Sequence, residues 1–274
     1  MLKFDIIFVE ICRTEGKTLE KVLALVSCLA TICVIIIGQI YWEGKIKSHA
    51  EAAHTMTEES APTIDKVEEI DEFSFNQLPQ ELVEKAKLAK QTGEKLKFVI
   101  YGSEATSTEE GAWPHILKAE LEENYVDIFD VLIYSDEDKT TYDVIDEKLY
   151  EKVVDEQPDV FLFEPFILKD NGLGIAQTLE NISFILEEIK SKHPDVTIYI
   201  QPAHPIYNAI YYPREVDELG QFSEENGYIY LNHWSSWPEQ DNEQILDFLT
   251  EGQNKPNEDG NKVWAEFLIN YFVK

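Results

Sequence analysis

The chain has 274 residues, 53 acidic and 23 basic, and a formal charge of −30 at neutral pH. This balance excludes a nucleic-acid-binding protein, because affinity for phosphate backbones comes from clustered lysine and arginine side chains. Since 44% of the residues are hydrophobic and 12% aromatic, the chain can bury a sizeable core, which excludes a wholly disordered or collagen-like protein. Its three cysteines all lie in the first 33 residues, so we expect no disulfide, no thiolate nucleophile and no cysteine zinc site in the rest. No glycine pattern of a dinucleotide-binding site or P-loop is present, so we expect no cofactor.

The first long apolar segment predicts a membrane anchor. Residues 22–42 carry no charge and are long enough to cross a hydrocarbon core of about 30 Å. Four basic residues precede this run, which favours a short cytoplasmic segment, 1–21, with the bulk of the chain outside. A cleaved signal peptide is disfavoured because its apolar region would be shorter, and lipidation of Cys28 is disfavoured because the apolar run continues beyond it. We therefore expect a single-pass protein of the cell membrane with an extracytoplasmic domain.

A polar stalk is predicted next, over residues 43–94, because Glu, Ala, Thr, Ser, Lys and Gln predominate there. An amphipathic helix is expected in its second half, starting near Pro79, with Leu82 and Ala86 on one face. The globular domain is predicted to cover residues 95–274.

Within this domain, apolar runs alternate with helical patterns. Strands are expected at 96–101, 126–134, 158–166, 196–202 and 228–231. Helices are expected from Pro114, at 142–155, around 175–189, and at 213–225 and 259–272. Strands separated by helices predict right-handed βαβ units, and therefore an α/β domain with a parallel sheet covered on both faces. In such folds the reactive groups collect at the carboxyl ends of the strands.

Several sequence blocks then carry a family resemblance. They are FVIYGSEAT, QPDVFLFEPFILKDNG, IYIQPAHPIY and KPNEDGNKVWAEFL, in this order over about residues 95–274. Together they resemble the SGNH/GDSL hydrolases, and more narrowly the membrane-anchored extracytoplasmic members of Bacillus-like bacteria. The resemblance implies a flavodoxin-like three-layer fold and ester hydrolysis. It also implies a Ser nucleophile in a Gly-Asp-Ser turn, a His base in a late Asp-x-x-His motif, and a Gly and an Asn that hold the oxyanion.

The chain departs from this pattern at the residues that carry the chemistry. When the family's Gly-Asp-Ser-x-Thr motif is aligned without gaps on residues 102–106, Glu104 takes the position of the nucleophilic serine. Ser103 lies one position before it. The oxyanion Asn becomes Lys169, which is followed by Asp170 and Asn171. The family's late Asp-x-x-His motif aligns with residues 251–254, which read Glu-Gly-Gln-Asn, and Lys255 precedes the Pro-Asn pair that follows. No histidine occurs after His233.

One interpretation is a re-wired hydrolase that acts on an ester of a cell-envelope glycan, a lipid or a small acyl substrate. Ser103 would attack, His233 or His204 would be the base, and an acid such as Glu104, Glu251 or Asp259 would orient the imidazole. The residues that we expect to bind the oxyanion or the substrate are Gly102, Asn171, Asp170, His204 and Trp234.

The alternative interpretation is a catalytically inactive domain that binds carbohydrate or a protein partner in the same crevice. A serine beside a glycine on a turn is more often a helix cap than a nucleophile, and Trp234 and Trp237 are as well suited to walling a pocket as to packing in the core. A third class, a metal-dependent enzyme using acidic clusters such as 136–138, is disfavoured because these carboxylates have no fixed spacing to a histidine. We therefore predict no metal site.

Overall fold

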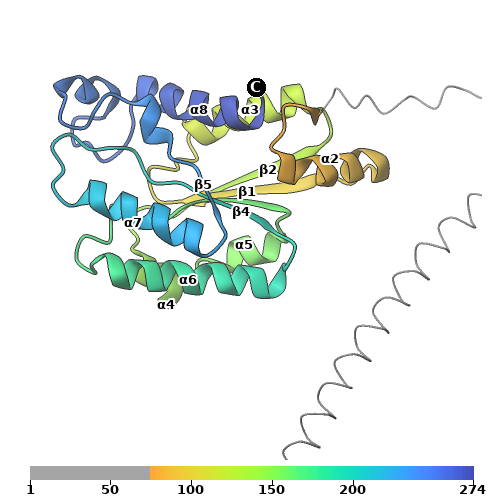
Figure 1. Ribbon diagram of the computed structural model, residues 1–274, viewed down its shortest axis with the longest axis horizontal. Coiled ribbons are helices and arrows are strands. Elements are labelled where there is room, and N and C mark those ends of the chain that lie inside the picture. The colour runs from red at the N-terminus through yellow and green to blue at the C-terminus, as the bar shows by residue number, and fades with distance from the viewer. Residues whose placement is uncertain (1–74) are drawn as a thin grey trace, which may run out of the picture. The chain divides into compact units, whose positions relative to one another are not determined.

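The computed structural model describes residues 75–274 (Figure 1). The predicted cytoplasmic segment 1–21, the predicted transmembrane helix 22–42 and the stalk up to residue 74 lie outside the described residues. Within the described part, every helix is too short or too polar to cross a bilayer.

Five parallel strands form one sheet in the order β2-β1-β3-β4-β5. They are β1 (Leu96–Gly102), β2 (Phe129–Ser135), β3 (Val160–Glu164), β4 (Thr197–Ile200) and β5 (Ile229–Tyr230). This is the flavodoxin-like order, and each predicted strand is present, so the predicted α/β class is confirmed. In register, Gly102 lies between Ser135 of β2 and Glu164 of β3, which brings the loops after these three strands together.

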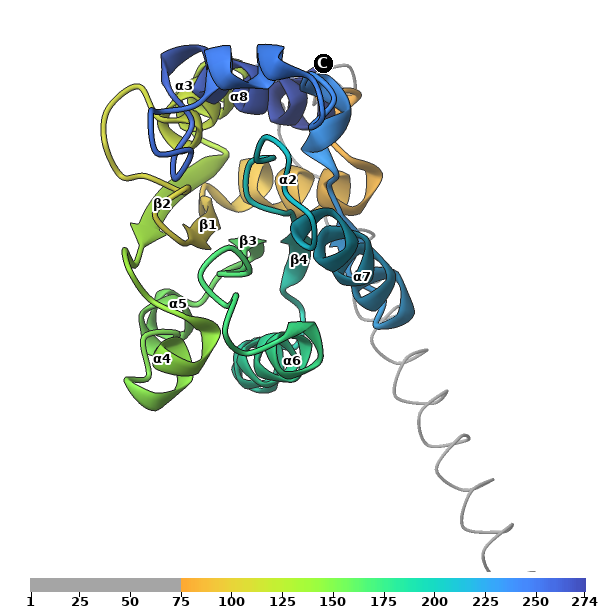
Figure 2. The same cartoon turned by 90° about the vertical axis from the view of Figure 1, so that its left-hand side faces the viewer.

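Helices cover both faces of the sheet (Figures 1 and 2). One face is covered by α2 (Gln80–Thr92), α3 (Trp113–Asn124) and α8 (Glu258–Phe272), the other by α4 (Thr141–Asp146), α5 (Glu151–Glu156), α6 (Ile175–Lys192) and α7 (Tyr212–Glu225). Alternate residues of β1 point to opposite faces, so Phe98 packs in the first core and Val99 in the second. A strand buried on both faces reads as a continuous apolar run, which is why β1 and β3 were recognisable.

Two elements differ from the prediction. The single helix expected at 142–155 is two short helices, α4 and α5, because Lys148 has a positive φ of 55° that interrupts the helical backbone. The second element is α2, which lies within the residues predicted as stalk but packs against the rest of the described domain. The amphipathic helix expected in the stalk is α2, and its apolar face, Leu82, Ala86 and Ala89, is buried in the core.

The segment between β5 and α8 contains two 3-10 helices, η2 (His233–Ser236) and η3 (Glu243–Phe248). A hairpin follows, closed by an antiparallel bridge between Leu249 and Pro256. We call residues 249–257 the 249–257 hairpin. It leads directly into α8, whose first turn is capped by the Asn257 side chain.

Candidate functional site

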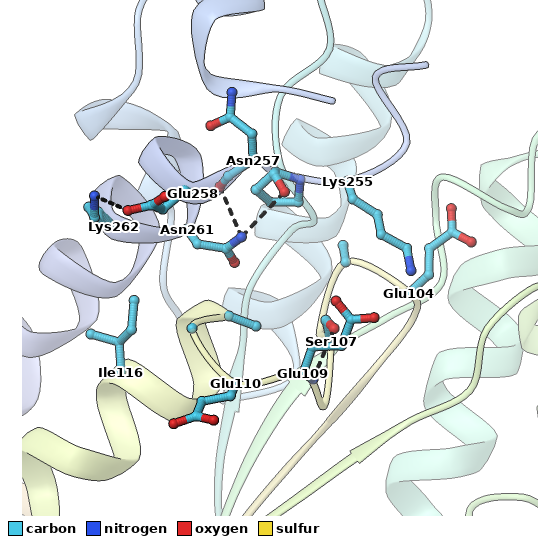
Figure 3. Close-up of a pocket in the computed structure, with 14 residues that line it drawn as sticks. Glu104, Ser107, Glu109, Glu110, Ile116, Lys255, Asn257, Glu258, Asn261 and Lys262 are labelled. Atoms are coloured by element: carbon cyan, nitrogen blue, oxygen red, sulfur yellow. Dashed lines mark hydrogen bonds and ion pairs between the residues drawn. The ribbon is translucent and has the colours of Figure 1, made fainter. Parts of the chain in front are cut away.

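A pocket of about 500 Å³ lies at the carboxyl edge of the sheet, between the turn that follows β1 and the start of α8 (Figure 3). Polar and charged side chains line it together with alanine, isoleucine and proline side chains. The residues that carry polar groups are Glu104, Ser107, Glu109, Glu110, Lys255, Asn257, Glu258, Asn261 and Lys262.

The turn after β1 is built around one buried carboxyl group, that of Glu164. Its Oε2 accepts hydrogen bonds from the Ser103 backbone N–H and the Ser103 Oγ, both at 2.8 Å, and from the Thr106 Oγ1 at 3.0 Å. Gly102 permits this close approach, because a Cβ there would lie 2.6 Å from the same oxygen. Burial raises the pKa of Glu164 to about 8, although the Ser103 and Thr106 hydrogen bonds favour its charged form.

Glu104, the residue at the expected nucleophile position, forms an ion pair with Lys169. Glu104 Oε2 lies 2.9 Å from Lys169 Nζ, and the Glu104 side chain is only 10% exposed. Lys169 also contacts Asp138, at 3.0 Å. Glu104 and Lys169, which occupy the positions of the family's nucleophilic serine and oxyanion asparagine, therefore contact each other.

The loop after β2 is tied to its surroundings by three consecutive acidic residues. Asp136 pairs with Lys152 at 2.7 Å, Glu137 with Lys255 at 2.9 Å, and Asp138 with Lys169. These lysines come from α5, from the 249–257 hairpin and from the loop after β3. Each carboxylate therefore joins the loop after β2 to a different part of the carboxyl edge.

His233 lies in the core, and neither of its ring nitrogens is available to Ser103. Nε2–H donates to the Pro202 carbonyl at 2.9 Å, and Nδ1 accepts from Trp237 Nε1–H at 2.9 Å. The ring stacks on Trp264 with centroids 4.0 Å apart. Burial lowers the pKa of His233 to about 3, so the imidazole is neutral at physiological pH.

His204 is also fully buried. Its Nε2–H donates to the Gln253 carbonyl at 3.0 Å, and this contact holds the tip of the 249–257 hairpin. Burial lowers the pKa of His204 to about 4. Neither candidate base therefore forms the pair with Ser103 that the re-wired triad requires, and both histidines act as hydrogen-bonded core residues.

The other candidates serve structure or lie at the surface. Asp170 is buried and accepts hydrogen bonds from the Thr141 N–H at 2.9 Å and the Thr141 Oγ1 at 2.5 Å, at the start of α4. Asn171 is exposed and donates to the Leu168 carbonyl. Trp234 Nε1–H donates to the Ala203 carbonyl at 2.7 Å. Glu251 is exposed on the hairpin.

The structure thus brings Gly102, Ser103 and Glu104 to the predicted edge but pairs them with other groups than expected. Sequence reasoning missed Glu164, whose signal was an acidic residue at the end of an otherwise apolar strand, FLFE. It considered Glu137 only as part of the acidic cluster 136–138 and missed the ion pair of Glu137 with Lys255. Among residues 75–274, no group of three or more His, Cys, Asp or Glu is arranged to hold a metal ion.

No family model matches the sequence, and no curated protein does. Solved structures do match. A lipolytic protein of the G-D-S-L family from Desulfitobacterium hafniense has a TM-score of 0.52 and 16% identity, over 64% of this chain and 98% of that one. A carbohydrate esterase of family 3 from Talaromyces cellulolyticus has a TM-score of 0.55 and 11% identity, over 63% and 94%. A GDSL-like lipase from Parabacteroides merdae has a TM-score of 0.55 and 14% identity, over 64% and 94%. The chain therefore has the SGNH/GDSL hydrolase fold, and the predicted resemblance is confirmed at this level.

Proposed function

We propose that the domain binds a cell-envelope carbohydrate in the pocket at its carboxyl edge and does not hydrolyse it with a serine. The observation that carries this proposal is the ion pair between Glu104 and Lys169, 2.9 Å apart. It fills the positions at which the family resemblance implies a nucleophile and an oxyanion amide. A carboxylate and an ammonium that neutralise each other there do not provide the nucleophile and base that acyl transfer needs.

Ser103 is poorly placed to replace the missing nucleophile. Its side chain is almost completely buried, and its Oγ–H is directed at Glu164 rather than into the pocket. A serine nucleophile is activated by a base that is itself oriented by a third group. His204 and His233 are both neutral, buried and hydrogen-bonded to backbone carbonyls.

The pocket walls support a carbohydrate as the ligand. Carboxylates accept hydrogen bonds from hydroxyl groups, and Glu109 and Glu110 line the pocket with exposed carboxylates. One of the similar structures is named as a carbohydrate esterase, which is consistent with a sugar in the equivalent crevice.

Ester hydrolysis is the second candidate, and one contact favours it. Ser103 Oγ lies 2.8 Å from Glu164 Oε2, and the pKa of Glu164, about 8, is close to the value at which a general base is most effective. In this alternative Glu164 takes the proton of Ser103 as its Oγ attacks the carbonyl carbon of an ester on an envelope glycan, a lipid or a small acyl substrate. The ester C–O bond breaks, Glu164 returns the proton to the alcohol that leaves, and water then hydrolyses the acyl-serine.

We also propose that residues 22–42 anchor the protein in the cell membrane and that the domain is extracytoplasmic. The uncharged apolar run and the preceding basic residues support this. Protease added to intact spheroplasts should digest the domain. Digestion only after lysis would contradict this topology.

Binding is tested with the full chain in detergent, by saturation-transfer NMR with acetylated xylo-oligosaccharides and with muropeptides. Ser107→Trp places a large side chain in the pocket, whereas Ser191→Trp adds the same side chain to an exposed position on α6. We expect transfer to at least one ligand in the wild type and in Ser191→Trp, and none in Ser107→Trp. No transfer to either ligand in the wild type would overturn the binding proposal.

Hydrolysis is tested on the same preparation with p-nitrophenyl acetate. We expect the wild type and Ser103→Ala to give the same background rate. A wild-type rate that Ser103→Ala abolishes would favour the second candidate.

A further inference from the structure

The carboxyl ends of β3 and β4 carry two buried polar side chains at neighbouring positions. Residues 160–163 of β3 pair in parallel with residues 197–200 of β4, and the Gln201 N–H continues this ladder by donating to the Phe163 carbonyl at 3.0 Å. Glu164 and Gln201 each follow the last paired residue of their strand, so they lie next to each other. Both side chains are completely buried.

The side chains of Glu164 and Gln201 also point to the same face of the sheet. Leu162 of β3 and Tyr199 of β4 pack in the core that α2, α3 and α8 cover. Because side chains alternate along a strand, the residues two positions later face this core as well. Neighbouring strands are about 4.8 Å apart, so the carboxyl group of Glu164 and the amide group of Gln201 are close.

The amide group of Gln201 is oriented by a closely packed aromatic side chain. Gln201 Oε1 accepts a hydrogen bond from Trp264 Nε1–H at 2.9 Å, and an indole N–H can only donate. The Trp264 ring stacks on Trp113 and on His233, with centroid distances of 4.7 and 4.0 Å. Gln201 Nε2 carries two donors and has no hydrogen-bond partner among residues 75–274.

The carboxyl group of Glu164 uses only one of its two oxygens. Oε2 accepts the three hydrogen bonds from Ser103 and Thr106, whereas Oε1 has no partner in the described part of the chain. Because donors surround Oε2, a proton that Glu164 binds lies on Oε1. Burial raises the pKa of Glu164 to about 8, so Oε1 donates below this pH and accepts above it.

The chemistry of these two atoms selects the group that joins them. Buried polar groups are nearly always paired, either with protein atoms or with ordered water. A direct bond from Gln201 Nε2 would suit only the charged carboxylate, because the protonated Oε1 is itself a donor. A cation would face the amide hydrogens and an anion would face the carboxylate. Water fits both states, because it accepts from Nε2–H and can either donate to Oε1 or accept from it.

We propose that one buried water molecule bridges Glu164 Oε1 and Gln201 Nε2. Two hydrogen bonds of ordinary length through a water span about 4.7 Å, which matches the spacing of neighbouring strands. The bridge ties the turn after β1, through Glu164 and Gln201, to the aromatic side chains around Trp264. This inference goes beyond the proposed function, because it does not depend on what the pocket binds.

The test is a crystal structure of the full chain, purified in detergent, at a resolution that shows ordered water. We expect a fully occupied oxygen within about 3.2 Å of both Glu164 Oε1 and Gln201 Nε2. Crystals kept well below and well above the Glu164 pKa of about 8 should both contain it. A direct contact between the two side-chain atoms, or no ordered oxygen between them, would overturn the bridge.

Gln201→Met tests the partner of the water. Methionine has a similar length but no N–H donor, so we expect the ordered oxygen to be lost. Gln221→Met is the matched control at an exposed position on α7, and it should retain the oxygen. An oxygen that stays fully ordered in Gln201→Met would overturn the assignment of Nε2. If Gln201→Met does not fold, the wild-type structure alone distinguishes the water from a direct bond.

Discussion

At the scale of single residues, the buried carboxyl group of Glu164 organises the carboxyl edge. Three donors from Ser103 and Thr106 converge on one of its oxygens, and they fix the turn that presents Glu104 to the pocket. The turn therefore depends on a group that lies on a different strand.

Gly102→Ala should strongly destabilise this arrangement. A Cβ at this position would lie 2.3 Å from Thr106 Oγ1 and 2.6 Å from Glu164 Oε2, so the turn must shift. We expect a loss of about 1 to 3 kcal/mol of unfolding free energy, as for other overpacked sites. Gly172→Ala is the control, because a Cβ there meets nothing within 4 Å. Denaturant unfolding that shows equal stability for both variants would contradict the account.

Glu164 should also make stability depend on pH. Its pKa of about 8 in the folded protein lies above the ordinary value of 4.5, so the folded state binds the extra proton between these values. This contribution is fully present below pH 4.5 and is lost as the pH rises to about 8. Relative to Glu164→Gln, which does not titrate, the wild type should lose unfolding free energy over this window. Denaturant unfolding at several pH values measures the difference, and parallel curves for the two proteins would refute it.

The site residues were only partly predictable. Matching the sequence blocks placed Glu104 and Lys169 at the positions of chemistry, but their contact depends on side-chain directions that spacing does not encode. The expected pairing of Ser103 with His233 was suggested because both follow strands. It does not form because the aromatic packing around His233 holds its ring in the core.

At the scale of elements, His233 anchors η2 to the end of β4. His233→Ala leaves the Pro202 carbonyl and Trp237 Nε1–H without their partner and opens a gap beside Trp264. We expect thermal or denaturant unfolding to show a loss of about 3 kcal/mol. His115→Ala, at a less buried position on α3, should cost under about 1 kcal/mol. Equal losses would indicate that His233 is not part of the core.

Asn257 should be a main determinant of the start of α8. Its Oδ1 accepts hydrogen bonds from the backbone N–H groups of Asp259 and Gly260, both at 3.0 Å. Asn257→Ala should lower the unfolding free energy by about 1 to 2 kcal/mol, and Asn257→Asp, which keeps the Oδ1 cap but loses the Nδ2–H bonds to the Asp247 and Leu249 carbonyls, should recover part of this loss. Chemical denaturation of the three proteins tests this, and an equal loss in both variants would contradict the capping role.

Elements were easier to predict than contacts, because hydrophobic periodicity is local. The continuous apolar runs of β1 and β3 identified buried parallel strands. The break between α4 and α5 was missed because Lys148, unlike glycine, gives no sequence signal for a positive φ. The role of α2 was missed because its apolar face, Leu82, Ala86 and Ala89, is short and surrounded by charged residues.

At the scale of the whole molecule, the strand order determines the fold, whereas the side chains of the loops at the carboxyl edge determine the chemistry. The strand order places the loops after β1, β2 and β3 side by side at the carboxyl edge of the sheet. In this chain those loops carry paired charges and a buried serine. A fold alone does not establish an activity, so the central claim concerns the state of Ser103.

The most direct test treats the full chain with a fluorophosphonate probe, which reacts with activated serines, and locates any adduct by peptide mass spectrometry. Because Ser103 is buried and both histidines are neutral core residues, we predict that the folded wild type gives no adduct. An adduct on Ser103 that Glu164→Gln abolishes would contradict the central claim and establish a serine hydrolase.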